Sequence, residues 1–181
     1  MDKREILQRL FYVDKLYDEK KFSGKNSKEV KEIISSIKIE VMNMDLKDVK
    51  ERVGNNLFLL RLEGEYCKLI EIDLEKLCIC DIHQLQFRNK HTLALRGELF
   101  KNIIADLNVE TAKKVNSIKK IAETLLEEIP SIVRKYGERF EVLMGNHRIM
   151  SLIQDGERTC NVLCICEEHE AENFPNLVFE R

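Results

Sequence analysis

The fold of this chain is decided by the stretch Phe140-Glu-Val-Leu-Met-Gly-Asn-His-Arg-Ile-Met-Ser-Leu-Ile153, in which a strand pattern changes to a helix pattern at one glycine. Apolar side chains alternate along residues 140–144 and then recur at helical spacing at Ile149, Leu152 and Ile153. Gly145 lets the backbone turn sharply and approach a ligand, while the free amides of the new helix carry partial positive charge. The stretch therefore predicts a strand, a turn at Gly145-Asn146, and a helix whose N-terminus suits a phosphate.

Four consecutive residues at this turn are candidates for phosphate binding: Gly145, Asn146, His147 and Arg148. Arg148 carries a planar fork of donors that matches a phosphate or carboxylate, and it equally fits a structural salt bridge. His147 suits either a hydrogen bond at the start of the helix or a role as acid or base. Asn146 fits either a helix cap or a ligand contact. Gly145 is needed for its backbone conformation in either case.

The motif Gly145-Asn146-His147-Arg148 resembles that of the ParB/sulfiredoxin-like superfamily, whose members carry a strand, then Gly-x-His-Arg or Gly-x-Arg-Arg, then a helix. Residues 128–143 are similar to the family's strand, turn and second strand, and residues 154–165 are similar to its closing strand. Upstream, Ile72-Asp-Leu-Glu-Lys-Leu and Gln86-Phe87-Arg88 are similar to its opening strand and Gln-x-Arg element. The resemblance covers residues 72–167 and implies an α+β fold.

The resemblance also implies a ligand. The free-serine kinases of the superfamily hold nucleotide phosphates at this turn, which implies a nucleoside triphosphate or diphosphate with Mg²⁺ and adds Gln86 and Arg88 to the phosphate-binding candidates. Phosphoryl transfer depends mainly on positioning and charge neutralisation, and His147 and Asp81 are the candidate catalytic residues for moving a proton. Sulfiredoxins place a catalytic cysteine where this chain has Asn146, so sulfinic acid reduction is not expected.

Three classes of function stay open. The first is a nucleotide-binding protein that acts as a small phosphotransferase or nucleotide hydrolase. The second is a ParB-like DNA-associated protein or nuclease that nucleotide binding switches; about thirty residues follow the motif, and we expect no helix-turn-helix among them. The third is a non-catalytic interaction module whose N-terminal helices bind a protein partner or form a homodimer. Whether the protein is an enzyme is therefore left open.

Composition sets the limits for these hypotheses. The chain has 181 residues, of which 44% are hydrophobic, enough to bury a core. Thirty basic residues stand against thirty-two acidic ones, so no general attraction to nucleic acid or to a membrane is expected. The N-terminus lacks an uninterrupted apolar stretch, which argues against a signal peptide or a membrane span and predicts a cytoplasmic protein.

Two segments share a pattern of two thiols and an imidazole: Cys78-Ile-Cys80-Asp-Ile-His83 and Cys164-Ile-Cys166-Glu-Glu-His169. Zinc prefers such ligands, and Cys-x-Cys on a strand places both sulfurs on one face. Both segments, however, are rich in apolar residues, where cysteine commonly behaves as a small buried hydrophobic side chain. The paired spacing of a structural zinc site is also absent, so buried thiols are the preferred interpretation and no metal is assigned.

Periodicity divides the chain into a helical N-terminal extension, residues 1–56, and an α+β domain, residues 57–181, with a small mixed sheet and flanking helices. We expect N-terminal helices over 2–20, from an N-cap at Ser27, and over 45–53. A hairpin over 57–72 and a strand through Cys78 follow. One helix over 96–108, and another from the cap Asn108 to about residue 129, precede the turn.

Overall fold

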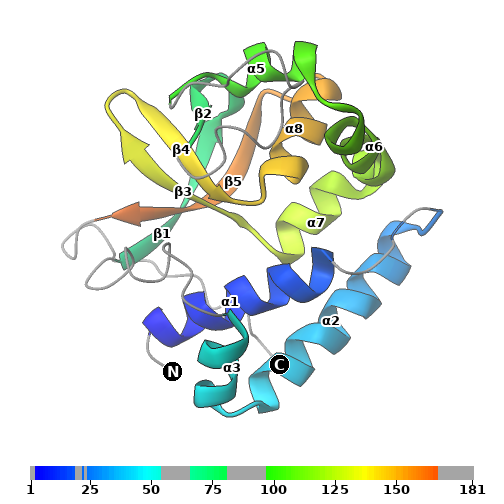
Figure 1. Ribbon diagram of the computed structural model, residues 1–181, viewed down its shortest axis with the longest axis vertical. Coiled ribbons are helices and arrows are strands. Elements are labelled where there is room, and N and C mark those ends of the chain that lie inside the picture. Colours follow the sequence, from blue (N-terminus) through cyan, green and yellow to red (C-terminus); the bar gives the residue numbers. More distant parts are fainter. Residues whose placement is uncertain (1–2, 19–21, 23, 54–65, 81–96, 167–181) are drawn as a thin grey trace.

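The computed structural model of the chain describes residues 3–18, 22, 24–53, 66–80 and 97–166 (Figure 1). Within these residues the fold is α+β, with a five-stranded mixed sheet that has helices on both of its faces. The predicted fold class is therefore confirmed. The expected strand over 57–62 lies outside the described residues.

Three N-terminal helices lie on one side of the sheet: α1 (Lys3–Asp18), α2 (Ser27–Asn43) and α3 (Leu46–Val53). Of these, α1 lies next to the sheet, and α2 and α3 pack on α1 (Figure 1). The predicted cap of α2 was one residue too late, because the N-cap is Asn26. Its side-chain oxygen accepts a hydrogen bond from the Glu29 amide at 3.0 Å, and the Glu29 carboxylate accepts one from the Asn26 amide at 2.8 Å. This reciprocal pair satisfies two amides at the helix start.

The sheet has the strand order β1-β5-β3-β4-β2. Its strands are β1 (Tyr66–Asp73), β2 (Leu77–Ile79), β3 (Ser131–Tyr136), β4 (Arg139–Met144) and β5 (Thr159–Cys166). The β1–β5 and β3–β4 pairs are antiparallel, whereas β3–β5 and β2–β4 are parallel. The stretch 72–77 is not one strand, because a 3₁₀ turn (Leu74–Lys76) separates β1 from β2 and the Asp73 carboxylate accepts from the Glu75 amide.

The opposite face is covered by α5 (Phe100–Ile103), α6 (Val109–Ile118), α7 (Ala122–Glu128) and α8 (Asn146–Gln154). Asn108 caps α6 as predicted, accepting from the Thr111 amide at 2.8 Å. Two predicted helices were too long. The one over 96–108 contains only α5 and a 3₁₀ turn (Ile104–Asp106), and the one from Asn108 to 129 is divided by a second 3₁₀ turn (Lys119–Ile121) into α6 and α7.

The division between α6 and α7 follows from the packing of the apolar stripe, which serves two cores. Ile118, Ile121 and Leu125 belong to the buried cluster that contains α1 and α2, whereas Val115, Ala122 and Leu126 belong to the cluster that contains α8. We call these the α1-side core and the α8-side core. A straight helix cannot turn one stripe towards both, so the chain changes direction between them.

The end of β4 carries a β-bulge directly before the glycine turn. Ile132 pairs with Met144 and Val133 pairs with Val142, which leaves Leu143 as an extra residue on β4. Leu143 and Met144 consequently both belong to the α1-side core, rather than alternating between faces as the sequence predicts. The bulge thus changes the direction of the chain where it enters the turn.

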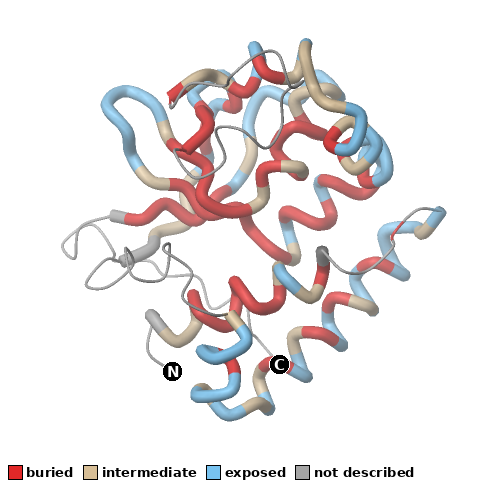
Figure 2. Tube along the Cα trace, in the orientation of Figure 1, coloured by how far each residue is buried: buried red, intermediate tan, exposed pale blue. Residues whose placement is uncertain are grey.

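The α1-side core crosses the predicted boundary between residues 56 and 57. It joins Leu10 and Val13 of α1 to Ile132, Leu163 and further buried side chains of the sheet. Figure 2 shows this burial along α1 and the adjoining strands, while the outer side of α2 is exposed. None of the helices in the described part of the chain combines the length and apolar character needed to cross a bilayer.

Candidate functional site

The predicted strand–turn–helix is present at residues 139–154. Gly145 is the N-cap of α8, with φ +91° and ψ +24°, in the left-handed region that glycine adopts readily. The Ile149 amide donates to the Gly145 carbonyl at 3.1 Å, which starts the helical ladder. The capping role considered for Asn146 was wrong, because Asn146 is the first helical residue and no side chain caps the helix.

The space beside Gly145 is occupied by protein atoms. A Cβ at this position would lie 2.1 Å from the Ser131 hydroxyl oxygen and 2.6 Å from Nη2 of Arg148. The Ser131 hydroxyl also donates to the Gly145 carbonyl at 3.4 Å. Glycine therefore admits the start of β3 on one side and allows the Arg148 side chain to fold back over the N-cap of its own helix.

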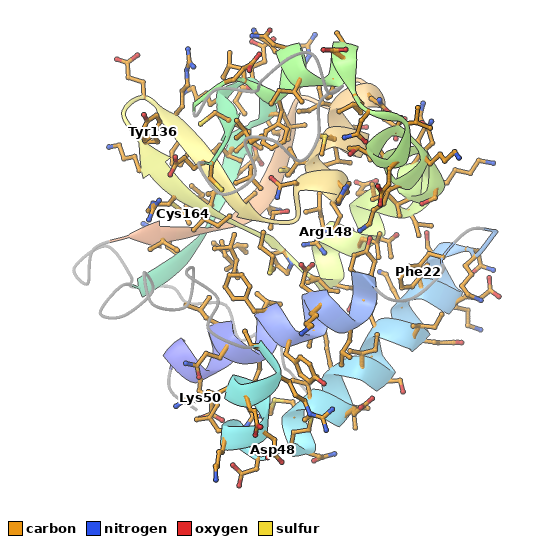
Figure 3. The ribbon with its side chains drawn as sticks, viewed as in Figure 1. Phe22, Asp48, Lys50, Tyr136, Arg148 and Cys164 are labelled. Atoms are coloured by element: carbon orange, nitrogen blue, oxygen red, sulfur yellow. The ribbon has the colours of Figure 1, made fainter. Side chains whose placement is uncertain are left out.

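Arg148 is buried between α8 and α1, with 1% of its side chain exposed (Figure 3). Its Nη1 donates to Oδ1 of Asp14 at 2.6 Å, and its guanidinium carbon lies 5.4 Å from the centre of the Tyr17 ring. The Asp14 side chain is 24% exposed. Of the two roles open for Arg148, the structure contains the salt bridge, and phosphate binding stays a prediction.

One edge of the Arg148 guanidinium has no hydrogen-bond partner among the described residues. The buried atoms concerned are Nε and Nη2. Two other buried atoms of α8, Oδ1 of Asn146 and Oγ of Ser151, also have no hydrogen-bond partner among the described residues. In a guanidinium, the N–H bonds of Nε and Nη2 point the same way and form a fork that matches two oxygens of a carboxylate or phosphate. Leaving such donors unsatisfied costs about 1–3 kcal/mol each, and more when the group is charged.

The remaining predicted site residues are placed only in part. His147 is half-buried, at the second position of α8. Asp81, Gln86 and Arg88 lie outside the described residues, as do His83 and His169. The structure therefore brings together Gly145, Asn146, His147 and Arg148, and leaves the candidates from residues 81–88 untested.

The two cysteine segments lie on strands that do not pair. Cys78 and Cys80 are buried in and after β2, and Cys164 is buried in β5. Two strands separate β2 from β5, so at about 4.8 Å per strand the segments are about 14 Å apart. Cys80 also belongs to the α1-side core and Cys164 to the α8-side core. Within the described residues, no three His, Cys, Asp or Glu side chains are grouped to hold a metal ion.

Sequence reasoning missed the residues that surround the guanidinium: Asp14, Tyr17 and Ser131. Asp14 and Tyr17 lie three residues apart and so share a helix face, but this spacing gives no sign of a partner 134 residues away. Ser131 follows Pro130 at the start of β3 and carries no local signal either.

No family model, curated protein or solved structure matches the chain. The protein is thus described by its own fold and site. It is an α+β protein in which a strand of the mixed sheet leads through a glycine turn into α8, and no side chain caps the start of that helix. Beneath that helix start lies a buried arginine with an unpaired edge among the described residues.

Proposed function

We propose that this protein binds a nucleotide through its phosphates at the N-terminus of α8. The observation that carries the proposal is the buried guanidinium of Arg148, whose Nε and Nη2 have no partner among the described residues and which lies against Gly145. An anion held by Nε and Nη2 at the start of α8 would meet that charge together with the amides and the positive dipole end of the helix. Gly145 and His147 are half-buried, so this end of the helix is partly open to solvent.

The donor set fits a phosphate better than a metal ion. Backbone amides and a guanidinium supply hydrogen-bond donors and positive charge, whereas the described residues contain no group of carboxylate, thiol or imidazole ligands. Mg²⁺ would therefore arrive with the nucleotide, held by its phosphates, as is usual for this ion. The described residue able to move a proton at the phosphates is His147, in a phosphotransferase or nucleotide hydrolase.

Direct titration tests the proposal. We would titrate ATP, ADP, CTP and GTP with Mg²⁺ into the wild type and into Arg148→Lys, which keeps the charge but loses the planar fork. We expect one nucleotide to bind and its affinity to fall about tenfold in the variant, the effect of about 1.4 kcal/mol. Calorimetry reports binding separately from any change in stability.

The matched control is Arg9→Lys, because Arg9 is also nearly buried and also pairs with a carboxylate of α1, that of Glu5 at 2.8 Å. This arginine donates to carbonyls at the end of α2, away from the glycine turn, so its replacement should leave nucleotide affinity unchanged. An equal loss in both variants would show a general effect on the fold. The absence of binding to all four nucleotides would overturn the proposal.

A non-catalytic interaction module is the second candidate, and one observation favours it. The Nη1 of Arg148 already binds Asp14 and the side chain is 1% exposed, an arrangement that a purely structural arginine would also have. Under this alternative no nucleotide binds and Arg148→Lys alters stability alone. Sedimentation velocity of the wild type would then show whether the chain forms a dimer.

A further inference from the structure

The N-terminal helix supplies an anion to the same guanidinium that the proposed site uses. Asp14 of α1 accepts from Nη1 of Arg148 at 2.6 Å, and Tyr17, one turn later, lies over the guanidinium face. We propose that Asp14 is an internal competitor for the phosphate, so that ligand binding and the docking of this end of α1 oppose each other. The inference rests on the proposed function and adds its regulation.

Burial shows which partner of the pair can move. Arg148 is enclosed at 1% exposure, whereas Asp14 is 24% exposed and lies in the second-last turn of α1. Rotation of this short side chain transfers the Asp14 carboxylate to water and loosens the last turn of α1, while Leu7 and Leu10 keep the rest of the helix in the core. The guanidinium, in contrast, has no such freedom and must keep an anion beside it. An incoming phosphate can fill that role.

Charge makes the two anions exclude each other. A phosphate held by Nε and Nη2 of Arg148 would lie only a few ångströms from a carboxylate held by Nη1 of the same planar group. Like charges at that separation repel, and the low dielectric around a buried group strengthens the repulsion. A bound phosphate therefore favours release of Asp14, and a docked Asp14 weakens the binding of phosphate.

Linkage makes this coupling reciprocal. If Asp14 lowers the affinity for the ligand by some factor, the ligand lowers the stability of the Asp14 contact by the same factor. The Tyr17 ring also lies against this guanidinium, so the last turn of α1 changes when a ligand occupies the site. Leu7 and Leu10 remain in the α1-side core. The packing of the last turn of α1 would thus depend on whether the ligand is bound.

The first test compares Asp14→Asn with wild type for binding of inorganic tripolyphosphate, measured by calorimetry at constant ionic strength. Asparagine keeps the shape and an acceptor oxygen but removes the competing charge, so we expect tighter binding by at least about fivefold, the lower end of usual coupling factors. The matched control is Glu5→Gln on the same helix. The Glu5 side chain is 25% exposed and pairs with Arg9, whose side chain is 6% exposed. Glu5→Gln therefore removes the same charge from a side chain of similar exposure. The affinity of Glu5→Gln for tripolyphosphate should equal that of the wild type.

A second measurement needs no variant. Amide hydrogen exchange of the wild type, with and without tripolyphosphate, should show faster exchange at residues 14–18 when the ligand is bound. Unchanged or slower exchange there would overturn the inference, as would wild-type binding that Asp14→Asn does not tighten; both results leave the proposed function standing. If neither the wild type nor Asp14→Asn binds tripolyphosphate, the inference is overturned, whereas the proposed function is decided separately by the nucleotide titration.

Discussion

Two separate constraints require glycine at position 145. The backbone is in the left-handed region at φ +91°, and a Cβ would overlap both the Ser131 hydroxyl and the Arg148 guanidinium. A pattern of strand, glycine and helix predicts the first constraint, because a sharp turn favours glycine. The second depends on side chains that only the folded chain brings to the turn. At the residue scale, the glycine thus serves the packing of protein atoms as well as any ligand.

Replacing this glycine tests both constraints. We expect Gly145→Ala to lower the free energy of unfolding by several kcal/mol, because the methyl group meets Ser131 atoms at 2.1 and 3.0 Å in addition to the cost of positive φ. Gly156→Ala at the other end of α8 is the control. Its φ is +82° and nothing lies within 4 Å of a Cβ, so only about 1–2 kcal/mol of strain is expected. Urea unfolding measures both, and equal losses would contradict the close contact with Ser131.

At the scale of elements, β5 illustrates how one strand serves both cores. It lies between β1 and β3, with Val162 and Cys164 in the α8-side core and Leu163 and Ile165 in the α1-side core. Cys160, near its start, packs against the α8-side core. Burial raises the pKa of the Cys160 thiol from 9.0 to about 12, because the thiolate would lose its hydration. This thiol consequently stays protonated in the folded protein at pH 10, where an ordinary thiol is mostly ionised.

The raised pKa predicts a dependence of stability on pH. Between pH 9 and 12 the unfolded chain loses the Cys160 proton while the folded chain keeps it, so stability falls as pH rises through this window and is unaffected below it. At pH 10 the loss is about 1.4 kcal/mol, the equivalent of one pH unit. We would measure unfolding free energies at pH 8 and pH 10 for the wild type and Cys160→Ala. The decline should be steeper in the wild type by this amount, and equal declines would show that Cys160 is not shielded from water.

At the scale of the whole molecule, the helical layer α1–α3 and the sheet share one core. Buried side chains of α1 and α2 pack with those of β3, β4 and β5, and ion pairs from α1 and α2 to α7 and α8 add to this contact. Lys38 of α2 binds Glu128 of α7 at 3.0 Å, and Arg148 of α8 binds Asp14 of α1 at 2.6 Å. Removing the layer would expose the apolar face of the sheet to water, at a cost proportional to the area uncovered.

The fragment 57–181 tests whether the predicted α+β domain folds without the N-terminal layer. We expect it to lose cooperative thermal unfolding and to bind a hydrophobic dye, because Ile132, Leu143 and Leu163 would lose their cover. Circular dichroism and dye fluorescence, with the full chain as reference, measure these properties. A fragment that unfolds cooperatively near the midpoint of the full chain would instead establish two independent domains.

The sequence by itself determined the features that depend on residues within about one turn of each other. These are the strand leading to Gly145, the helix that follows the turn and the cap at Asn108. Taken together along the chain, such strand and helix patterns also predict the α+β class. Periodicity and capping act locally, so a single sequence displays them.

Only the tertiary structure decided which atoms meet at the turn. It paired Arg148 with Asp14 across 134 residues, set Ser131 against Gly145, and divided the stripe after Asn108 between two cores. Such contacts depend on how whole layers pack. The sequence around Asp14 or Ser131 therefore gives no indication of which residue each will contact. The sequence therefore predicts the glycine turn. The ion pair between Arg148 and Asp14 follows only from the packing of α1 in the folded chain.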